Sequence, residues 1–275
     1  MKKLGFIGAG NMAEALARGL LAKKIFSAAE LIASDVDQAR RRKFTRLLKA
    51  ETTADNLDVV SQSRVIVLAV KPQTIDVVLG EIATALSANR KRSTTLFISI
   101  AAGVPISRLE NHLGANTRVI RVMPNAPAMV GQGMAALVGG SHATKVDERF
   151  ALKIFRAVGE AVMLDDESLL DAVTALSGSG PAYVYLFIQA MTEAAVKEGL
   201  PAELALQMAL QTARGAEQTM RQSRMAPSEL IRMVASPGGT TEAALRSFAG
   251  DRFSAIVGAA IHAAAERSRE LGRSR

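Results

Sequence analysis

The N-terminus carries a glycine-rich segment of the type that binds the pyrophosphate of a dinucleotide. Gly8 and Gly10 follow an apolar run and precede a stretch with helical spacing, in which Ala13 is the next small residue. A glycine at 8 permits a tight turn, and the one at 10 lets phosphate approach the backbone. The alternative is a purely structural strand–helix turn. We predict that the cofactor is bound here by Gly8, Ala9, Gly10, Asn11 and Met12.

Further candidates follow the strands that we expect along the chain. In an open α/β sheet, ligands bind beyond the carboxyl ends of the strands. This rule gives the candidates Ser34, Asp35, Val70, Lys71, Pro72, Ala101, Ala102, Pro124 and Asn125. Asn56 is a further cofactor-binding candidate. Lys71 is the one cation at a strand end. It contacts the phosphate or ribose of the cofactor or, as the alternative, is an ordinary surface lysine. Because the set lacks an evident general acid, it favours a reaction in which the cofactor supplies the difficult step, such as hydride transfer.

Two neighbouring features disagree about the cofactor. Asp35 ends the second expected strand, where a carboxylate usually accepts hydrogen bonds from the adenosine ribose and repels a 2′-phosphate. The run Arg40-Arg41-Arg42 begins one or two turns later and would bind that phosphate instead. The choice between NADP and NAD is therefore left open, and we expect activity with both.

A second segment with chemical potential is Ser236-Pro237-Gly238-Gly239-Thr240-Thr241. Its glycines let backbone N–H groups turn toward a ligand, and a helix beginning near Thr241 presents a positive end to a carboxylate. The two threonine hydroxyls cap a helix or bind a substrate. Capping alone needs only one such residue. We therefore predict that a ligand contacts Ser236, Gly238, Gly239, Thr240 and Thr241.

Composition narrows the classes of function. Cysteine is absent from the 275 residues, which excludes disulfides, thiolate catalysis and zinc–thiolate sites. His112, His142 and His262 lie outside the motifs, no metal-ligand spacing is apparent, and we predict no metal site. No apolar run is long enough to span a membrane and no signal peptide is evident, so we expect a cytoplasmic protein without a membrane partner.

The net charge is +8, and we interpret most of the basic residues as lying on solvent-exposed helix faces. A phosphorylated small ligand is the second interpretation of the basic residues, and nucleic acid is the last. Only 4% of residues are aromatic, and the interleaved stacking residues of a nucleic-acid surface are missing. We therefore predict no nucleic-acid partner.

Strand and helix patterns alternate up to about residue 165. After the N-terminal strand, strands are expected at 31–35, 51–53, 65–70, 95–99, 119–123, 135–138 and 161–164. Beyond residue 168 only helical spacing is found, with helices expected at 181–198, 201–223, 227–235 and 240–272, the last broken near Gly250. The alternation predicts an α/β fold with a mainly parallel sheet. We expect a Rossmann-type dinucleotide-binding domain over 1–165 and an all-helical domain over 166–275.

Six colinear segments resemble the pyrroline-5-carboxylate reductases. They are Gly5–Met12, Ala69–Pro72, Ser99–Val104, Arg121–Pro127, Leu176–Tyr183 and Val234–Thr241. The last two are quite specific to that family, whereas the first is shared by many reductases. The chain departs from the family at Ala126, where Thr is more frequent, and in the arginine-rich stretch after Asp35.

The resemblance implies reduction of L-1-pyrroline-5-carboxylate to L-proline by NADPH or NADH, the last step of proline biosynthesis. It implies that Thr241 is the catalytic partner of the imine nitrogen and that the amides of Gly238–Thr241 hold the substrate carboxylate. The nicotinamide would be lined by Ala101, Ala102, Pro124 and Asn125. The helical domain would be a substrate and dimerisation module, which implies a homodimer with shared sites and, as a larger assembly, a ring of dimers.

Two alternatives stay open. A related two-domain reductase would act on a β-hydroxy acid or another cyclic imine. The hydroxy-acid enzymes generally rely on a lysine of the helical domain, and here Lys197 is the only lysine after Lys153 and has the surroundings of an exposed helix end. A nucleotide-sensing regulator would bind the cofactor without turnover, and the intact Ser236–Thr241 segment disfavours it.

Overall fold

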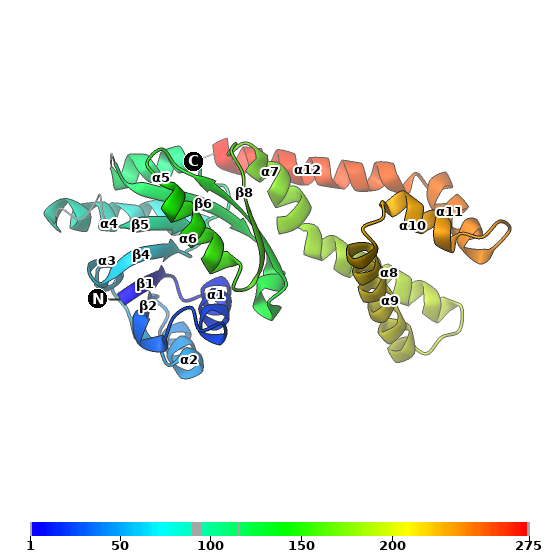
Figure 1. Ribbon diagram of the computed structural model, residues 1–275, viewed down its shortest axis with the longest axis horizontal. Coiled ribbons are helices and arrows are strands. Elements are labelled where there is room, and N and C mark those ends of the chain that lie inside the picture. Colours follow the sequence, from blue (N-terminus) through cyan, green and yellow to red (C-terminus); the bar gives the residue numbers. More distant parts are fainter. Residues whose placement is uncertain (1, 90–94, 115, 274–275) are drawn as a thin grey trace. The chain divides into compact units, whose positions relative to one another are not determined.

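The computed structural model describes residues 2–89, 95–114 and 116–273. The chain forms two compact units, one of Met1–Gly178 with Ala264–Arg275 and one of Ser179–Ala263 (Figure 1). The first unit thus extends beyond the expected division at residue 165. The reason is that Leu170 and Ala175 are buried within it, Leu170 beside Ile106 and Val138.

The first unit is built on one eight-stranded sheet with the order β3-β2-β1-β4-β5-β6-β7-β8. Its strands are β1 (Lys2–Ile7), β2 (Leu31–Ser34), β3 (Glu51–Thr53), β4 (Ser63–Leu68), β5 (Leu96–Ser99), β6 (Arg118–Pro124), β7 (Gly133–Gly139) and β8 (Gly159–Met163). All neighbouring pairs are parallel except β6 with β7. The short link between β6 and β7 joins two strands that are neighbours in the sheet, and a short link between neighbouring strands favours an antiparallel pair. The mainly parallel Rossmann-type sheet is confirmed.

Helices cover both faces of this sheet. They are α1 (Asn11–Ala22), α2 (Gln38–Leu48), α3 (Asn56–Gln62), α4 (Ile75–Asn89), α5 (Ile106–Leu113), α6 (Lys145–Phe155) and α7 (Leu169–Val173). Helix α3 was not expected from the sequence. It is only seven residues long, and its start is fixed by the Asp55 carboxylate, which accepts the Leu57 N–H at 2.8 Å.

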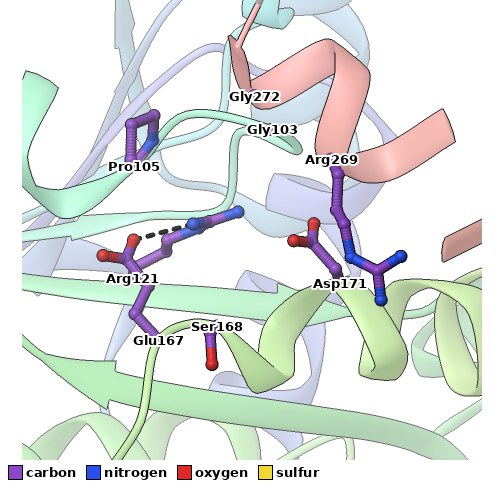
Figure 2. A pocket seen from close by; sticks show the side chains of 8 residues that line it. All are labelled: Gly103, Pro105, Arg121, Glu167, Ser168, Asp171, Arg269 and Gly272. Carbon is purple, nitrogen blue, oxygen red and sulfur yellow. Dashed lines mark hydrogen bonds and ion pairs between the residues drawn. The ribbon is translucent and has the colours of Figure 1, made fainter. Parts of the chain in front are cut away.

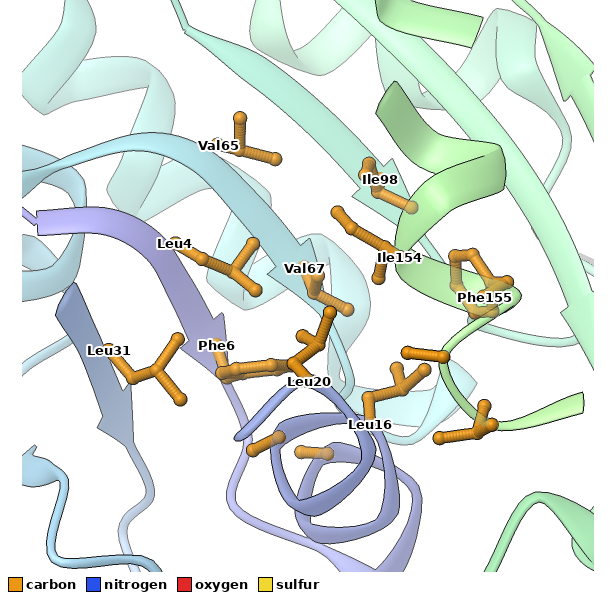
Figure 3. Packing of buried hydrophobic residues seen from close by; sticks show 14 of the residues in the cluster. Leu4, Phe6, Leu16, Leu20, Leu31, Val65, Val67, Ile98, Ile154 and Phe155 are labelled. Carbon is orange, nitrogen blue, oxygen red and sulfur yellow. The ribbon is translucent and has the colours of Figure 1, made fainter. Parts of the chain in front are cut away.

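Strand β4 shows why both faces are covered. Val65 and Val67 belong to one core with α1, α2 and α6, while Ile66 and Leu68 belong to the other core with α3, α4 and α5. Successive side chains of a strand point to opposite faces, so a continuous apolar run must be buried on both. Figure 3 shows the first core, where α1 and α6 pack on the strands. Both faces of the sheet below the strand ends are therefore covered by packed side chains.

The second unit is entirely helical. It contains α8 (Gly180–Lys197), α9 (Ala202–Ser223), α10 (Pro227–Val234), α11 (Thr240–Gly250) and the first part of α12 (Phe253–Arg273), close to the boundaries expected from the sequence. Helices α8 and α9 form a hairpin that turns at Gly199, whose φ of +100° suits glycine. In the described part of the chain, every helix is too short or too polar to cross a lipid bilayer.

Candidate functional site

The two glycines of the turn between β1 and α1, Gly8 and Gly10, are required for different reasons. Gly8 has a φ of +100°, and a Cβ atom there would lie 2.6 Å from the carbonyl oxygen of Ala69, so only glycine fits. Gly10 has ordinary extended backbone angles, but no atom lies within 4 Å of the position where its Cβ would be. The space in front of the α1 N-terminus is therefore open to a ligand, as a pyrophosphate requires.

The predicted cofactor residues gather at one edge of the sheet. Because β1, β2, β4, β5 and β6 are mutually parallel, their carboxyl ends lie together. The glycine turn, Ser34 and Asp35, Val70 to Pro72, Ala101 and Ala102, and Pro124 and Asn125 occupy or follow these ends, and Asn56 begins α3 beside them. All of them belong to the first unit. The structure brings the set together, and its contact with a cofactor stays a prediction.

Ser34 and Asn56 are tied to each other at this edge. The Ser34 hydroxyl donates to Asn56 Oδ1 at 2.7 Å, and Asn56 Nδ2 donates to Glu81 Oε2 at 2.9 Å. Asn56 follows the end of β3, and this link joins it to the end of β2. It fixes the start of α3 against the end of β2.

Asp35 points back into the protein. Its Oδ2 accepts the Ala9 N–H at 3.0 Å, its Oδ1 accepts the Asp37 N–H at 2.9 Å, and only 6% of its side chain is exposed. Two backbone donors thus hold the carboxylate against the glycine turn. The side chains of Arg40 and Asp37 are about half exposed at this strand end, at 50% and 48%, whereas that of Asp35 is not.

The nicotinamide end of the predicted site is lined by smaller groups. Ala101 is buried, whereas Ala102 and the Lys71 side chain are exposed. The amide of Asn125 is occupied within the protein: its Oδ1 accepts the Met134 N–H at 2.8 Å, and its Nδ2 donates to the Ser177 carbonyl at 3.1 Å. Asn125 would therefore shape the site through its position more than through a free amide.

The Ser236–Thr241 segment lies in the second unit and forms the turn into α11. Gly238 has a φ of +71°, and a Cβ on Gly239 would lie 2.5 Å from Ser236 Oγ. The Gly239 N–H donates to the Ser236 carbonyl at 3.0 Å, and the Gly238 N–H donates to the Glu242 carboxylate. Two of the amides expected to hold a carboxylate are therefore engaged locally.

The first turn of α11 supplies the remaining donors. The helix begins at Thr240 after the N-cap Gly239, which has no side chain to cap it. The N–H groups at the start of a helix have no partner within that helix. Thr240 and Thr241 thus present backbone donors together with their hydroxyl groups. Sequence reasoning missed Glu242, whose carboxylate occupies one amide of the turn; its place in the first helical turn is the signal that would have found it.

The first unit also contains a cavity of about 460 Å³ that sequence reasoning missed (Figure 2). Arg121 is 2.7 Å from Glu167 Oε1, which also accepts the Ile106 N–H at 2.8 Å, and Asp171 accepts the Ser268 hydroxyl at 2.6 Å. These contacts join β6, α5, α7 and the end of α12. The cavity is lined by Gly103, Pro105, Arg121, Glu167, Ser168, Asp171, Arg269 and Gly272.

Two protein-family models match this chain. One describes pyrroline-5-carboxylate reductase dimerisation and matches residues 167–271. The other describes NADP oxidoreductases dependent on coenzyme F420 and matches residues 3–103. The two matches fall on the helical part and on the strands that carry the glycine turn.

Similarity to named relatives extends over nearly the whole chain. A pyrroline-5-carboxylate reductase of Pseudomonas aeruginosa is 44% identical over 98% of this chain and 96% of the relative, and one of Arabidopsis thaliana is 39% identical over 99% and 96%. The solved structure of a pyrroline-5-carboxylate reductase from Coxiella burnetii superposes with a TM-score of 0.91 at 33% identity, covering 99% of both chains. That of the Plasmodium falciparum reductase with NADP bound superposes with a TM-score of 0.87 at 33% identity, covering 98% of both chains.

Proposed function

This chain belongs to the pyrroline-5-carboxylate reductase family, and we propose that it reduces L-1-pyrroline-5-carboxylate to L-proline with NADPH or NADH, the last step of proline biosynthesis. One observation supports the proposal beyond membership. The chain combines an open glycine turn, with free space at Gly10, and a helix start at Thr240 and Thr241 that offers donors to a small carboxylate. In this proposal the glycine turn serves the cofactor and the helix start serves the substrate.

The first unit would hold the dinucleotide. Gly8 to Met12 would face the pyrophosphate. The end of β2 with Ser34 and Asp35, together with Asn56, would lie beside the adenosine, and the ends of β4, β5 and β6 would face the nicotinamide. When bound, the cofactor supplies the hydride that reaches the imine carbon. The protein leaves the space in front of Gly10 free of other atoms, and the Asp35 carboxylate holds the turn by accepting the Ala9 N–H.

The second unit would hold the substrate. In this proposal, the backbone N–H groups at the start of α11 bind the substrate carboxylate, because a helix N-terminus stabilises an anion. The Thr241 hydroxyl donates a hydrogen bond to the imine nitrogen, which gains electron density as the imine carbon is reduced. Such assistance lowers the barrier when the bond strengthens in the transition state. Thr241 is the one residue to which we give a catalytic role.

We propose that the functional form is a homodimer held together by the second unit. Its helices leave large apolar side chains in water, including Tyr185 (63% exposed), Leu186 (66%) and Leu210 (49%). Tyr185, Leu206 and Leu210 line a hollow of about 350 Å³ on α8 and α9. A cluster of exposed apolar side chains favours a protein interface. The family model for dimerisation covers the same helices, and a sedimentation experiment distinguishes a dimer from a ring of dimers.

The proposal places the enzyme in the cytoplasm, with no nucleic-acid or membrane partner. A chain without cysteine is compatible with a reducing compartment. The hydroxy-acid alternative is weakened by Lys197, which is the exposed last residue of α8.

A turnover assay tests the proposed function. The purified protein is mixed with pyrroline-5-carboxylate and NADPH or NADH, cofactor oxidation is followed by absorbance, and proline is quantified by chromatography. We expect one proline for each cofactor oxidised. A nucleotide sensor would bind the cofactor without oxidising it, and a hydroxy-acid enzyme would instead turn over β-hydroxy acids with the oxidised cofactor. Either result would overturn the proposal.

A further inference from the structure

The Asp35 carboxylate at the end of β2 accepts hydrogen bonds from within the protein. Asp35 accepts the N–H of Ala9 through Oδ2 and that of Asp37 through Oδ1, at 3.0 and 2.9 Å. Its side chain is 6% exposed. A carboxylate that discriminates against a ribose phosphate must present its charge to the ligand. Here that charge is directed to the glycine turn and its backbone donors.

The guanidinium of Arg40 lies beside the Asp35 carboxylate. Arg40 Nη1 lies 3.6 Å from Asp35 Oδ2, the same oxygen that accepts from the glycine turn, and its Nε lies 3.6 Å from Asp37 Oδ2. Half of the Arg40 side chain remains exposed. The Asp37 carboxylate also caps α2 by accepting the Ala39 N–H at 2.7 Å, so the backbone that carries Arg40 is fixed. The Asp35 carboxylate thus lies between the Arg40 guanidinium and the glycine turn, and half of the Arg40 side chain is exposed to solvent.

The next arginine is placed differently. Arg41 Nη1 donates to the carbonyl oxygens of Asp35 and Val36 at 2.5 and 3.1 Å. It braces the turn between β2 and α2 by occupying two backbone acceptors. Of the two, Arg40 is the cation that sits beside the Asp35 carboxylate and the glycine turn.

We propose that Arg40 binds the 2′-phosphate of the cofactor and makes this enzyme prefer NADPH over NADH, with Asp35 acting as a positioning residue for the glycine turn. The inference rests on the proposed function and specifies its cofactor. A phosphate dianion forms charge-assisted hydrogen bonds with a guanidinium, and it attracts Arg40 more strongly than the two carboxylates that already share it. Arg40 and the two backbone donors offset the charge of Asp35, so the repulsion expected from that residue type is reduced.

Binding measurements on the intact protein test this assignment. The affinities of NADP⁺ and NAD⁺ are measured by titration calorimetry for the natural protein and for Arg40→Gln, Arg40→Lys and Arg46→Gln. Arg46 is an exposed arginine farther along α2, so its variant removes the same charge from the same helix. Melting temperatures confirm that each variant is folded.

We expect Arg40→Gln to weaken NADP⁺ binding about ten- to a hundredfold, the range for a lost hydrogen bond to a charged group, and to change NAD⁺ binding less than about threefold. Arg40→Lys should retain part of the preference, and Arg46→Gln should retain all of it. Equal losses for both cofactors, or an Arg46 effect as large as that of Arg40, would overturn the assignment. A protein that still makes proline in either case retains the proposed function, whereas one that binds neither cofactor contradicts the proposed function itself.

Discussion

Asn125 Nδ2 donates a hydrogen bond to the carbonyl oxygen of Ser177 at 3.1 Å, across a separation of 52 residues in the sequence. The same nitrogen lies 3.3 Å from Ser177 Oγ, and Asn125 Oδ1 accepts the Met134 N–H at 2.8 Å. Two family segments that are separate in the sequence therefore meet in one unit. Asn125 fixes the end of β6, the start of β7 and the π-helical turn Thr174–Gly178 with one side chain.

Replacing this side chain should destabilise the first unit. In Asn125→Ala, the Met134 N–H and the Ser177 carbonyl lose their partner, which costs about 1–3 kcal/mol of the free energy of unfolding. Urea titration measures it. Asn111→Ala, at an exposed position of α5, is the control and should change stability by less than about 0.5 kcal/mol. Similar values for the two variants would show that the bridge contributes nothing.

The two glycines of the turn should separate binding from folding. Gly10 has extended angles and open space, so Gly10→Val should fold and melt like the natural protein. The valine occupies the space of the pyrophosphate, and strain of this kind costs about 1–3 kcal/mol, which weakens cofactor binding about ten- to a hundredfold. Calorimetric titration with NADP⁺ checks this. Unchanged affinity in a folded Gly10→Val protein would contradict the placement of the pyrophosphate.

Gly8 provides the matched contrast. A Cβ there meets the Ala69 carbonyl at 2.6 Å, and the φ of +100° is unfavourable for any other residue. We expect Gly8→Ala to lower the melting temperature clearly, unlike Gly10→Val. A Gly8→Ala protein with natural stability would show that the turn relaxes.

Thr241 should affect the chemical step. If its hydroxyl bonds the imine nitrogen more strongly in the transition state, Thr241→Val lowers kcat and kcat/KM together, by about 10²-fold or more. Thr241→Ser keeps a hydroxyl and should restore most of the rate. Melting temperatures must be followed, because the residue lies in the first turn of α11. Natural kcat in Thr241→Val would leave the helix N-terminus as a carboxylate site only.

The apolar surface of the second unit should control assembly. Leu210 is 49% exposed in the hollow on α8 and α9. Placing a charge there in Leu210→Asp penalises burial at an interface, so sedimentation should shift from dimer to monomer. Gln207→Asp, at an exposed polar position of α9, is the control. A Leu210→Asp dimer as tight as the natural one would place the interface elsewhere.

Glu30 predicts how stability responds to acid. The Lys3 ammonium, 2.6 Å away, and the Ser27 N–H and hydroxyl lower the pKa of Glu30 from 4.5 to about 2. A carboxylate with a lowered folded-state pKa stabilises the protein above its unfolded-state pKa and loses that contribution as pH falls through the folded-state value. The melting-temperature difference between the natural protein and Glu30→Gln should therefore be full at pH 6 and shrink below pH 4.5 toward pH 2. A difference that stays constant with pH would contradict this account.

Much of the fold is encoded in short stretches of sequence. The apolar run of β4 predicts a strand buried on both faces, and each face is indeed covered by its own core. The breaks at Gly199 and Gly250 mark helix ends, because glycine ends a helix at low cost. Local spacing and turn residues determine these features, so no distant contact is needed to predict them.

The partners of the site side chains were decided by tertiary structure. The sequence places Asp35 at a strand end, but the register of β1 with β2 turns its carboxylate to the Ala9 N–H rather than outward. Likewise the Asn125 amide donates to the Ser177 carbonyl rather than to a ligand. The first unit continues to Gly178 because Leu170 and Ala175 are buried in it. A side chain's position follows from its own neighbours in the chain. Its hydrogen-bond partner depends on which distant backbone groups the packed strands bring within about 3 Å, and only the assembled fold sets that.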